Sequence, residues 1–432
     1  MTVTDTFINR CIMGTAKPNQ VDDFIDQWHA GAIGQGLELR EMLGLDKPEY
    51  VRFMRSGSAI ETIVTERQAA LHFAGALPLP LRKFESIDQF RHVVANIRHQ
   101  AEYIGQDAEQ QPIYDASRPK PVITFHGTVK LHGTNCGVAF DLVNDKVTAQ
   151  SKDRMLSIEH DNFQFCAWLE SEKGAADLEQ LMRIIAQTDE IFSIKPVAAC
   201  RVFGEWCGPL VNGKTAIGQL SLRWVVFKVL VSFANGQEMW LPLERIATEW
   251  AMHRGGVPSL IHFITDYPQW SVAVDFNAPE DSLDELERVT LAVEAECPVA
   301  KALGGNGIGE GVVWACQDAT YGHHTFKVKG TKHKGTKNSR LVQIEPEVLA
   351  SMDAFVDAVV TDSRLEQGFE LIRAEHGKVT EDHIGRFLQW MGQDVLKEEV
   401  DTLEASGLER KQVMSRVNHR AKAWLMPRLA RV

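Results

Sequence analysis

The sequence predicts an α+β protein with antiparallel strands in the middle of the chain and helices at both ends. Apolar residues recur at helical spacing over residues 5–75 and again from about residue 345 to the end. From about residue 120 the period of the apolar residues changes to two, which indicates strands. Helices between these strands do not alternate with them regularly, so the pattern favours an antiparallel sheet over repeated parallel βαβ units.

The composition excludes several classes of protein. The chain has 432 residues, of which 44% are hydrophobic, so it can bury a sizeable core divided between two or three domains. A formal net charge of −12 argues against general coating of nucleic acid, but a local basic groove is compatible with it. The seven cysteines form no C-x-x-C pair, so neither a zinc site nor a disulfide framework is predicted. Neither a signal peptide nor a membrane-spanning run is evident, so we expect a soluble cytoplasmic protein.

The N-terminal residues are expected to form several helices. Phe24 and Trp28 share one helical face, and Pro48 is typical of the first turn of a further helix. Alternating prolines in residues 77–81 favour an extended linker, which places a domain boundary there. No recognisable chemistry precedes this boundary, so residues 1–77 are expected to form a helical module for docking or for positioning a substrate.

The central part of the chain is expected to form short strands. Asn144-Asp145, between apolar segments 137–142 and 146–149, is a hairpin signal. Further strands are expected over residues 122–125, 199–203, 222–231, 311–314 and 325–329, and helices over residues 175–190, 242–254 and 280–297. We therefore expect a strand-rich domain over residues 78–345 and a helical C-terminal domain over residues 346–432.

Two glycine motifs look like phosphate-binding loops but lack the necessary context. Residues 208–215 match the P-loop pattern G-x-x-x-x-G-K-[ST], which needs a helix directly after it to aim backbone amides at phosphates. Residues 216–219 instead lead quickly into a predicted strand, so we interpret the match as accidental. Gly305, Gly307 and Gly309 have neither the spacing of a dinucleotide-binding fingerprint nor a strand before them.

A more informative set of residues is spread along the central domain. Lys130 lies where a strand enters a turn, at the start of the segment K-L-H-G-T-N. Glu205 ends one predicted strand, Glu310 begins another, and Lys327 and Lys329 alternate on one face of a third. Each piece alone is typical of a salt-bridged surface strand. Together they supply a lysine nucleophile, two carboxylates and two further cations.

In this order the segments resemble the motifs of the covalent nucleotidyltransferase superfamily of polynucleotide ligases and capping enzymes. The closer resemblance is to the RNA ligase 2 family of phage and bacterial RNA-repair ligases, because His132 stands in the nucleophile motif where DNA ligases have aspartate. Residues 203–205 resemble motif III, 224–227 motif IIIa, 310–311 motif IV and 327–329 motif V. The segment 81–88 resembles the opening of that family, so the resemblance covers roughly residues 80–345. The helical tail resembles its small C-terminal domain.

The resemblance implies a role for each residue. Lys130 would attack the α-phosphate of ATP and carry AMP as a lysyl-adenylate. Glu205 and Glu310 would hold ribose hydroxyls and Mg²⁺ or Mn²⁺, and Lys327 and Lys329 would stabilise the charge of the transferring phosphoryl group. The residues expected to bind the nucleotide are Thr128, Val129, Lys130, Lys152, Glu205, Phe227, Glu310, Lys327 and Lys329. The residues expected to contact RNA are His132, Asn135, Arg154, Lys332, Lys334 and Lys337.

Several of these roles keep an alternative. Phe227 would stack on adenine, or it is an ordinary core phenylalanine. His132 would contact ribose, phosphate or the RNA 3′ end, or it is a histidine satisfied within its turn. The arginine that the family has after the hairpin is replaced by Lys152, with Arg154 as the alternative, and lysine does not bind two phosphate oxygens as a fork. Lys228 stands where an acidic residue commonly follows the motif IIIa phenylalanine.

The proposed chemistry requires Lys130 to lose a proton. We expect Lys327, Lys329 and a bound divalent cation to destabilise its ammonium group and to lower its pKa toward neutrality. The basic run over residues 327–340 would contact RNA phosphates or leaving pyrophosphate, although a charge run is ordinarily a solvated loop.

The leading hypothesis is an ATP-dependent RNA ligase that joins a 5′-phosphate to a 3′-hydroxyl through lysyl-adenylate and RNA-adenylate intermediates. RNA with such ends, nicked duplex foremost, is the expected partner. One alternative is a DNA ligase or capping guanylyltransferase, against which the helical tail speaks. Another is a nucleic-acid-binding homologue that no longer ligates, for which Lys152 and Lys228 are hints. The sequence does not indicate the physiological RNA, the role of residues 1–77 or the oligomeric state.

Overall fold

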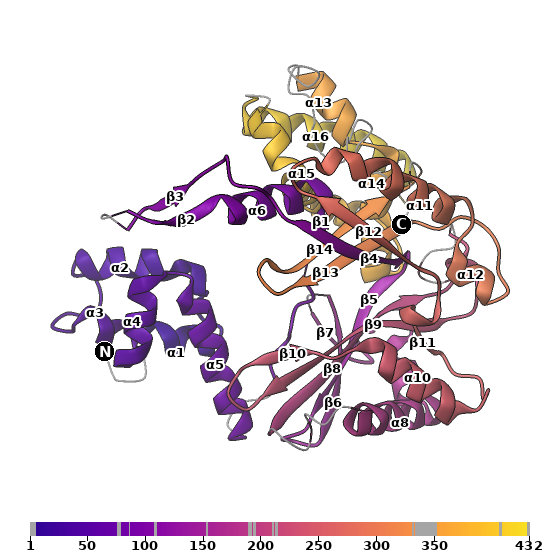
Figure 1. Cartoon of the computed structure of the whole chain (residues 1–432), viewed down its shortest axis with the longest axis horizontal. Coiled ribbons are helices and arrows are strands. Elements are labelled where there is room, and N and C mark those ends of the chain that lie inside the picture. Colours follow the sequence, from indigo (N-terminus) through magenta and orange to yellow (C-terminus); the bar gives the residue numbers. More distant parts are fainter. Residues whose placement is uncertain are drawn as a thin grey trace.

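A computed structural model shows two β-sheets flanked by helices, with a helical group at each end of the chain (Figure 1). It describes residues 6–75, 79–85, 87–107, 110–152, 154–188, 192, 196–209, 211, 215–330, 332, 352–405 and 408–429. Most strand pairs are antiparallel, so the mixed helical and antiparallel-sheet fold predicted from the sequence is confirmed. No helix in the described residues is both long enough and apolar enough to cross a membrane.

Five α-helices in residues 6–75 form the N-terminal group, as the apolar spacing predicts. They are α1 (Phe7–Ile12), α2 (Val21–His29), α3 (Leu39–Leu43), α4 (Lys47–Arg55) and α5 (Ala59–Phe73). Helix α4 begins as Pro48 indicates, and a capping box closes its first turn. The Asp46 carboxylate accepts from the Glu49 amide and the Glu49 carboxylate accepts from the Asp46 amide, both at 2.8 Å. A core of their own, which includes Phe7, Leu43 and Ile63, holds these helices together.

The first large sheet has five strands. Their order is β1 (Asp88–Gln89), β14 (Gly322–Lys329), β13 (Gly311–Asp318), β4 (Val122–Lys130) and β12 (Gln269–Asp275). Along β4 buried and more exposed residues alternate, so one face of the sheet is apolar and the other is polar. Helices α6 (Phe90–Glu102) and α11 (Leu283–Ala295) pack on the apolar face, where the rings of Phe90 and Phe326 lie 4.8 Å apart.

The second sheet has seven strands in the described residues, and its three central strands are mostly buried. Its order is β10 (Glu238–Trp240), β9 (Arg223–Phe233), β8 (Val197–Cys207), β5 (Thr134–Asp141), β6 (Lys146–Ser151) and β7 (Met155–Leu156), and β11 (Ile261–Phe263) pairs with β9. Helices α7 (Phe165–Glu170), α8 (Glu172–Thr188) and α10 (Leu243–Arg254) accompany this sheet, and α12 (Pro298–Ala302) precedes β13. The polar face of the first sheet faces the second, because Lys228 Nζ of β9 lies 3.0 Å from His323 Nε2 of β14.

Four α-helices in the part of the C-terminal region that the structure describes form a second group, again as predicted. They are α13 (Met352–Val359), α14 (Asp362–His376), α15 (Ile384–Ala405) and α16 (Arg410–Leu425). Their buried side chains, among them Phe355, Phe387 and Leu425, form a separate cluster. The predicted domain boundaries at 77 and 345 fall outside the described residues and stay a prediction.

The predicted elements are present, and the structure adds others. The hairpin turn is where Asn144-Asp145 indicates it, with Asp145 in the left-handed region. After the P-loop-like segment, a 3₁₀ turn over Ile217–Gln219 leads into β9, and the described residues between the segment and β9 form no α-helix, in agreement with an accidental match. The additions include β12, α6 and a hairpin of β2 (Tyr103–Gln106) and β3 (Pro112–Tyr114) that projects from the end of α6 (Figure 1).

Candidate active site

Two rows of residues cross the polar face of the five-stranded sheet. In the first row Lys130 of β4, Gly311 of β13 and Lys329 of β14 are register partners. In the second row, one pleat away, Thr128, Val313 and Lys327 are partners in the same three strands. Strand alternation therefore places the three predicted lysines on one face, which we call the catalytic face.

The residues between these rows point the other way. Val129, Val312 and Val328 are buried in the central core. Val129 was predicted to bind the nucleotide, and its side chain packs in this core.

Glu310 connects the charges of the catalytic face. Its Oε2 accepts a hydrogen bond from Lys130 Nζ at 2.7 Å, and its Oε1 lies 3.3 Å from Lys329 Nζ. His132 Nδ1 lies 3.5 Å from the same Oε2. Burial raises the pKa of Glu310, but the charges of Lys130 and Lys329 outweigh burial and hold that pKa below its usual range. Glu310 is therefore ionised and pairs with two lysines at once.

This pairing corrects the expected pKa of Lys130. Burial acts to lower the pKa of Lys130, as a nucleophile requires. The Glu310 and Glu205 carboxylates oppose burial, and the resulting pKa lies above its ordinary value. The prediction that neighbouring cations lower it is therefore wrong for the ligand-free chain, because the nearest charge to the Lys130 ammonium is a carboxylate. The lowered pKa belongs instead to Lys329, through burial and through the charges of Lys130 and Lys327, against the opposing charge of Glu310.

Two glycines permit this close arrangement. A Cβ atom on Gly311 would lie 2.1 Å from the carbonyl oxygen of Val328, and Gly311 has φ +154°. A Cβ atom on Gly133 would lie 2.4 Å from the carbonyl oxygen of Trp206. Neither position has room for a side chain, so the G in each motif is a steric requirement.

Glu205 approaches the nucleophile motif from the second sheet. It is the register partner of Asn135, and its Oε1 accepts a hydrogen bond from the backbone amide of Gly133 at 3.0 Å. Burial raises its pKa to about 7, and Glu310 adds to the rise while Lys130 and the Gly133 amide oppose it. The turn that follows Lys130 is therefore held against β8 by one of the two predicted metal ligands.

A β-bulge sets the direction of Phe227. Phe203 pairs with Lys228 and Gly204 pairs with Val226, so Phe227 is the extra, unpaired residue of β9. Its ring is half-buried and lies 5.1 Å from the ring of Phe84, which also lies 5.1 Å from the ring of Phe203. Bulges commonly re-aim a side chain next to a site. Phe84 belongs to the segment that resembles the opening of the ligase family.

The positions that depart from the family have defined surroundings. Lys152 is exposed at the end of β6, and its carbonyl accepts a hydrogen bond from the Phe84 amide at 3.2 Å. Arg154 donates to the carbonyl of His160 at 2.9 Å, so it holds a turn. Lys228 lies 4.6 Å above the ring of Trp240, and burial lowers its pKa.

The basic run is described only at its beginning. Lys332 is exposed, its amide donates to Glu294 Oε1 at 2.7 Å, and its carbonyl accepts from Ser363 Oγ at 2.9 Å. Lys334 and Lys337, both predicted RNA contacts, lie outside the described residues.

A divalent cation fits the carboxylates that the two sheets bring to the Lys130 turn. Mg²⁺ commonly takes one or two protein carboxylates and completes its shell with water and substrate phosphates. Glu205 and Glu310 both contact the 130–133 segment and match that donor set. No group of three or more His, Cys, Asp or Glu that could hold a metal by itself occurs in the described residues. The residues present thus fit a cation shared with a nucleotide.

The C-terminal helices supply contacts that the motifs do not reveal. Lys327 Nζ donates to Glu398 Oε1 of α15 at 2.7 Å, and Lys329 Nζ donates to Gln367 Oε1 of α14 at 3.4 Å. Glu398 is 71 positions from Lys327 along the chain, and the sequence of α15 offers no signal that separates it from its neighbours.

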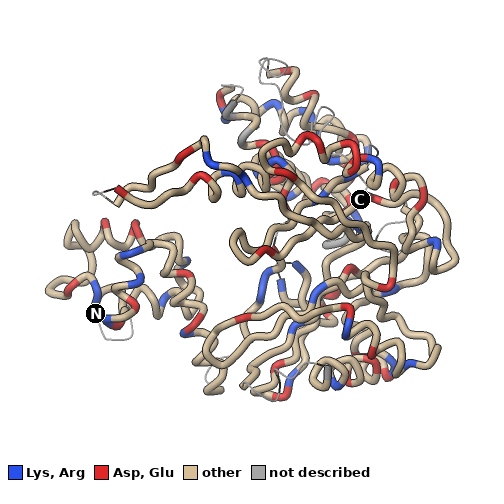
Figure 2. Tube along the Cα trace, in the orientation of Figure 1, with Lys and Arg blue, Asp and Glu red and all other residues tan. Residues whose placement is uncertain are grey.

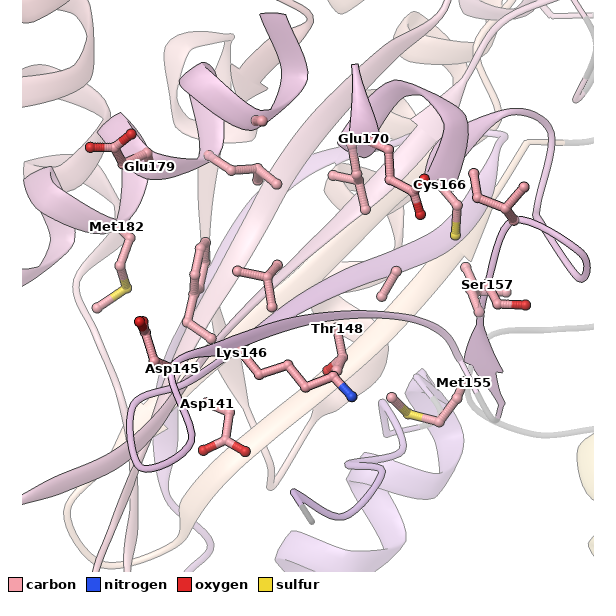
Figure 3. Close-up of a pocket in the computed structure, with 18 of the residues that line it drawn as sticks. Asp141, Asp145, Lys146, Thr148, Met155, Ser157, Cys166, Glu170, Glu179 and Met182 are labelled. Atoms are coloured by element: carbon pink, nitrogen blue, oxygen red, sulfur yellow. The ribbon is translucent and has the colours of Figure 1, made fainter. Parts of the chain in front are cut away.

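A groove of about 1000 Å³ lies elsewhere, along the second sheet (Figure 3). Strands β5 to β7 and helices α7 and α8 line it, and none of the lysines or glutamates of the catalytic face is among its lining residues. Its polar residues include Asp141, Asp145, Glu170 and Glu179 beside Lys146. Such an acidic lining disfavours a polyphosphate or an RNA strand.

Comparison with known proteins identifies the central region. The family model described as RNA ligase matches residues 123–329, just under half of the chain, and this stretch contains the catalytic face. No curated protein sequence matches the chain. The predicted resemblance to RNA ligases is thereby confirmed over residues 123–329, and the RNA ligase 2 subfamily stays a prediction.

Solved structures of an RNA ligase from Naegleria gruberi also show a distant likeness. A mutant of that ligase with ATP and Mn is 13% identical, with 59% of this chain and 58% of that chain covered and a TM-score of 0.33. The same ligase with PPi is 14% identical, with 59% and 57% covered and a TM-score of 0.33. The chain thus spans less than two thirds of the length of these ligases, and TM-scores this low do not establish a shared overall fold.

Proposed function

We propose, from the RNA ligase family match over residues 123–329, that the chain is an ATP-dependent RNA ligase that seals a 5′-phosphate to a 3′-hydroxyl. The observation that carries the proposal is the cluster of Lys130, Glu310 and Lys329 on one sheet face, with Glu205 reaching it from the other sheet. An accidental surface salt bridge would not bring together these residues from three strands beside a glycine that admits no side chain.

In the first step Lys130 forms a lysyl-adenylate. Its Nζ, after losing a proton, attacks the α-phosphorus of ATP, so that a P–N bond forms, a P–O bond breaks and pyrophosphate leaves. Lys327 and Lys329 stabilise the negative charge of the transferring group. A divalent cation, held by Glu205 and Glu310, would supply further positive charge to the phosphates.

The loss of the proton depends on the Glu310 pair. In the ligand-free chain Glu310 keeps the Lys130 ammonium charged. A cation held by Glu205 and Glu310 would weaken that stabilisation, and burial would then favour the neutral amine of Lys130. The salt bridge accordingly keeps Lys130 protonated until the nucleotide site is filled.

In the later steps the adenylate passes to RNA. A 5′-phosphate oxygen attacks the phosphorus on Lys130, which breaks the P–N bond and gives an RNA-adenylate. The 3′-hydroxyl then attacks the 5′-phosphate, the phosphodiester forms and AMP leaves. His132, Asn135, Arg154 and Lys332 are the described residues proposed to contact RNA.

The remaining assignments belong to the same proposal. Phe227 stacks on adenine, and Thr128 and Lys152 contact the nucleotide. Residues 1–77, 78–345 and 346–432 act as a helical module, the adenylyltransferase domain and a helical domain. The helices at residues 352–405 and 408–429 disfavour the OB barrel that DNA ligases and capping enzymes have at this place.

Labelling with radioactive ATP tests the proposal. The protein is incubated with α-labelled ATP or GTP and a divalent metal, and then with nicked RNA, nicked DNA or single strands. We expect covalent label from ATP on the wild type, none on Lys130→Ala, and discharge of the label by RNA ends. Undiminished label on Lys130→Ala would contradict the covalent mechanism, preference for GTP would indicate capping, and label that no polynucleotide discharges would indicate a homologue that no longer ligates.

A further inference from the structure

A carboxylate from the C-terminal helices reaches the catalytic face. Glu398 of α15 accepts a hydrogen bond from Lys327 Nζ at 2.7 Å, and the exposed fractions of the two side chains are only 16% and 17%. Glu398 belongs to none of the nucleotidyltransferase motifs and lies outside the region that the RNA ligase model matches.

A buried arginine fixes the Glu398 carboxylate. Arg364 of α14, 1% exposed, donates from Nη2 to Glu398 Oε2 at 3.0 Å, and its Nε donates to Asp394 at 2.8 Å. Each oxygen of Glu398 thus binds a different cation. Burial raises the pKa of Glu398, but Lys327 and Arg364 outweigh burial and hold that pKa below its usual range, so the carboxylate is ionised at neutral pH.

The backbone of Glu398 is held as well. Its carbonyl accepts hydrogen bonds from Gln89 Nε2, at 3.3 Å, and from Arg91 Nη2. Gln89 lies in β1 and is the register partner of Lys327. Strand β1, which pairs with β14 at Lys327, therefore also binds the backbone of Glu398. Both the backbone and the side chain of Glu398 are thus fixed relative to β14.

We propose that Glu398 is a positioning residue for adenylyl transfer, which holds the Lys327 ammonium over the catalytic face, so that the C-terminal helices complete the active site. A free lysine side chain has four rotatable bonds and loses much conformational freedom when it is fixed in one place. The hydrogen bond to Glu398 restricts the Lys327 side chain before the nucleotide binds, so this conformational freedom is not lost during binding. The bond uses one of the three ammonium protons. The inference rests on the proposed function, in which Lys327 contacts the transferring phosphoryl group.

A contact that served only to dock the helices would not need this residue. Arg91 pairs with Glu399, and Ser363 donates to the carbonyl of Lys332, so other bonds already join the two parts. Asp394 offers a matched control. It lies one turn before Glu398 on α15 and binds the same arginine, but no lysine of the catalytic face is among its partners in the described structure.

A double-mutant cycle tests whether Glu398 acts through Lys327. The rate of lysyl-adenylate formation at saturating ATP and the ATP half-saturation are measured for the wild type, Glu398→Gln, Lys327→Ala and the double variant. We expect Glu398→Gln to lower the rate about tenfold or more, because small displacements of a positioned group cost that much. In the Lys327→Ala background the same change should cost nothing further, and Asp394→Asn should retain most of the rate.

The contrary outcomes are distinct. An unchanged rate for Glu398→Gln, an equal loss in the Lys327→Ala background, or faster labelling with tighter ATP binding would each overturn the positioning role. The last would mean that Glu398 competes with phosphates instead. Thermal melting of each variant shows whether a loss comes from misfolding.

A second measurement does not depend on ligation. NMR of ε-¹³C-labelled lysines, with the Lys327 signal assigned through Lys327→Arg, reports the order of that side chain in the ligand-free protein. We expect Glu398→Gln to make the Lys327 signal markedly more mobile, and Asp394→Asn to leave it nearly unchanged. An equally ordered Lys327 in Glu398→Gln would overturn the inference. If the signal changes but the wild type takes no label from ATP, the proposed function fails and the positioning contact stands.

Discussion

Glu310 sets the charge balance of the catalytic face at the scale of single residues. It pairs with Lys130 and Lys329 together, although 180 positions of the chain separate it from Lys130. The motif letters predict that these residues belong to one site. They do not predict which of these residues pair. The pKa of Lys130 depends on which charge lies nearest in space, and the order of residues in the sequence does not reveal this.

Gly133 allows a prediction about a single position. Gly133→Ala should lower stability by about 1–3 kcal/mol through overpacking against Trp206 and Glu205, and it should sharply reduce covalent labelling because the Lys130 turn must move. The measurements are the melting temperature and the label from ATP. Gly392→Ala is the control, since a Cβ atom at that position would have nothing within 4 Å and alanine favours a helix. Equal effects of both changes would refute the steric argument.

Strand β9 shows at the scale of elements how a local irregularity serves the site. The β-branched and aromatic residues of segment 222–231 predict the strand, and motif IIIa marks Phe227, but only the register with β8 reveals the bulge at that residue. In a regular strand, successive residues such as Val226 and Phe227 point to opposite faces of the sheet. The bulge leaves Phe227 free to meet Phe84.

Replacement of that ring tests the stacking role. Phe227→Leu keeps an apolar side chain but removes the aromatic face, so we expect the ATP half-saturation of labelling to rise about three- to tenfold. The melting temperature should change little, because the ring is only half-buried. Phe203→Leu, buried in the neighbouring strand, is the comparison and should act mainly on stability. A larger effect of Phe203→Leu on half-saturation would place the base elsewhere.

Strand β11 carries a pH-sensitive residue. Burial, helped by the charge of Arg223, lowers the pKa of His262 to about 4, and its Nδ1 lies 3.3 Å from the hydroxyl of Tyr267. The unfolded chain binds a proton near pH 6.5 and the folded chain does not, so the stability from neutral His262 is full above that pH and is lost as the pH falls toward 4. We expect the melting temperature to fall more steeply over this window in the wild type than in His262→Asn. Parallel curves would show that His262 contributes nothing.

At the scale of the whole molecule, the sequence reveals the helices and strands better than it reveals the contacts between them. Helical spacing predicts both helical groups, and the period of two predicts most strands of the two sheets. The hairpin of β2 and β3 is not evident, because its short segments lack clear alternation, whereas Trp270, Val272 and Val274 do alternate in β12 and could have indicated that strand. The contact between Glu398 and Lys327 is not predictable either, since residue spacing describes one helix and not what that helix meets.

Acidic and basic residues are intermingled along most of the chain (Figure 2), so the net charge of −12 says little about any one surface. The polar pairs that matter join different parts of the molecule. Lys327 with Glu398 joins the first sheet to the C-terminal helices, and His72 with Asp141 joins α5 to the end of β5.

The second of these pairs predicts how the N-terminal helices are attached. His72 Nε2 lies 3.0 Å from Asp141 Oδ1, and both side chains are almost fully buried. The other described partners of the buried Asp141 carboxylate, the Val143 and Asn144 amides and Asn144 Nδ2, lie next to it in the chain, whereas His72 comes from α5. We therefore expect His72→Leu to detach the N-terminal helices, with a larger radius of gyration by small-angle scattering and a separate melting transition. Arg52→Gln is the control, because its pair with Glu66 at 2.7 Å lies within the N-terminal group and its loss should not change the radius. If His72→Leu keeps the wild-type radius and a single transition, other contacts hold α5 on the second sheet.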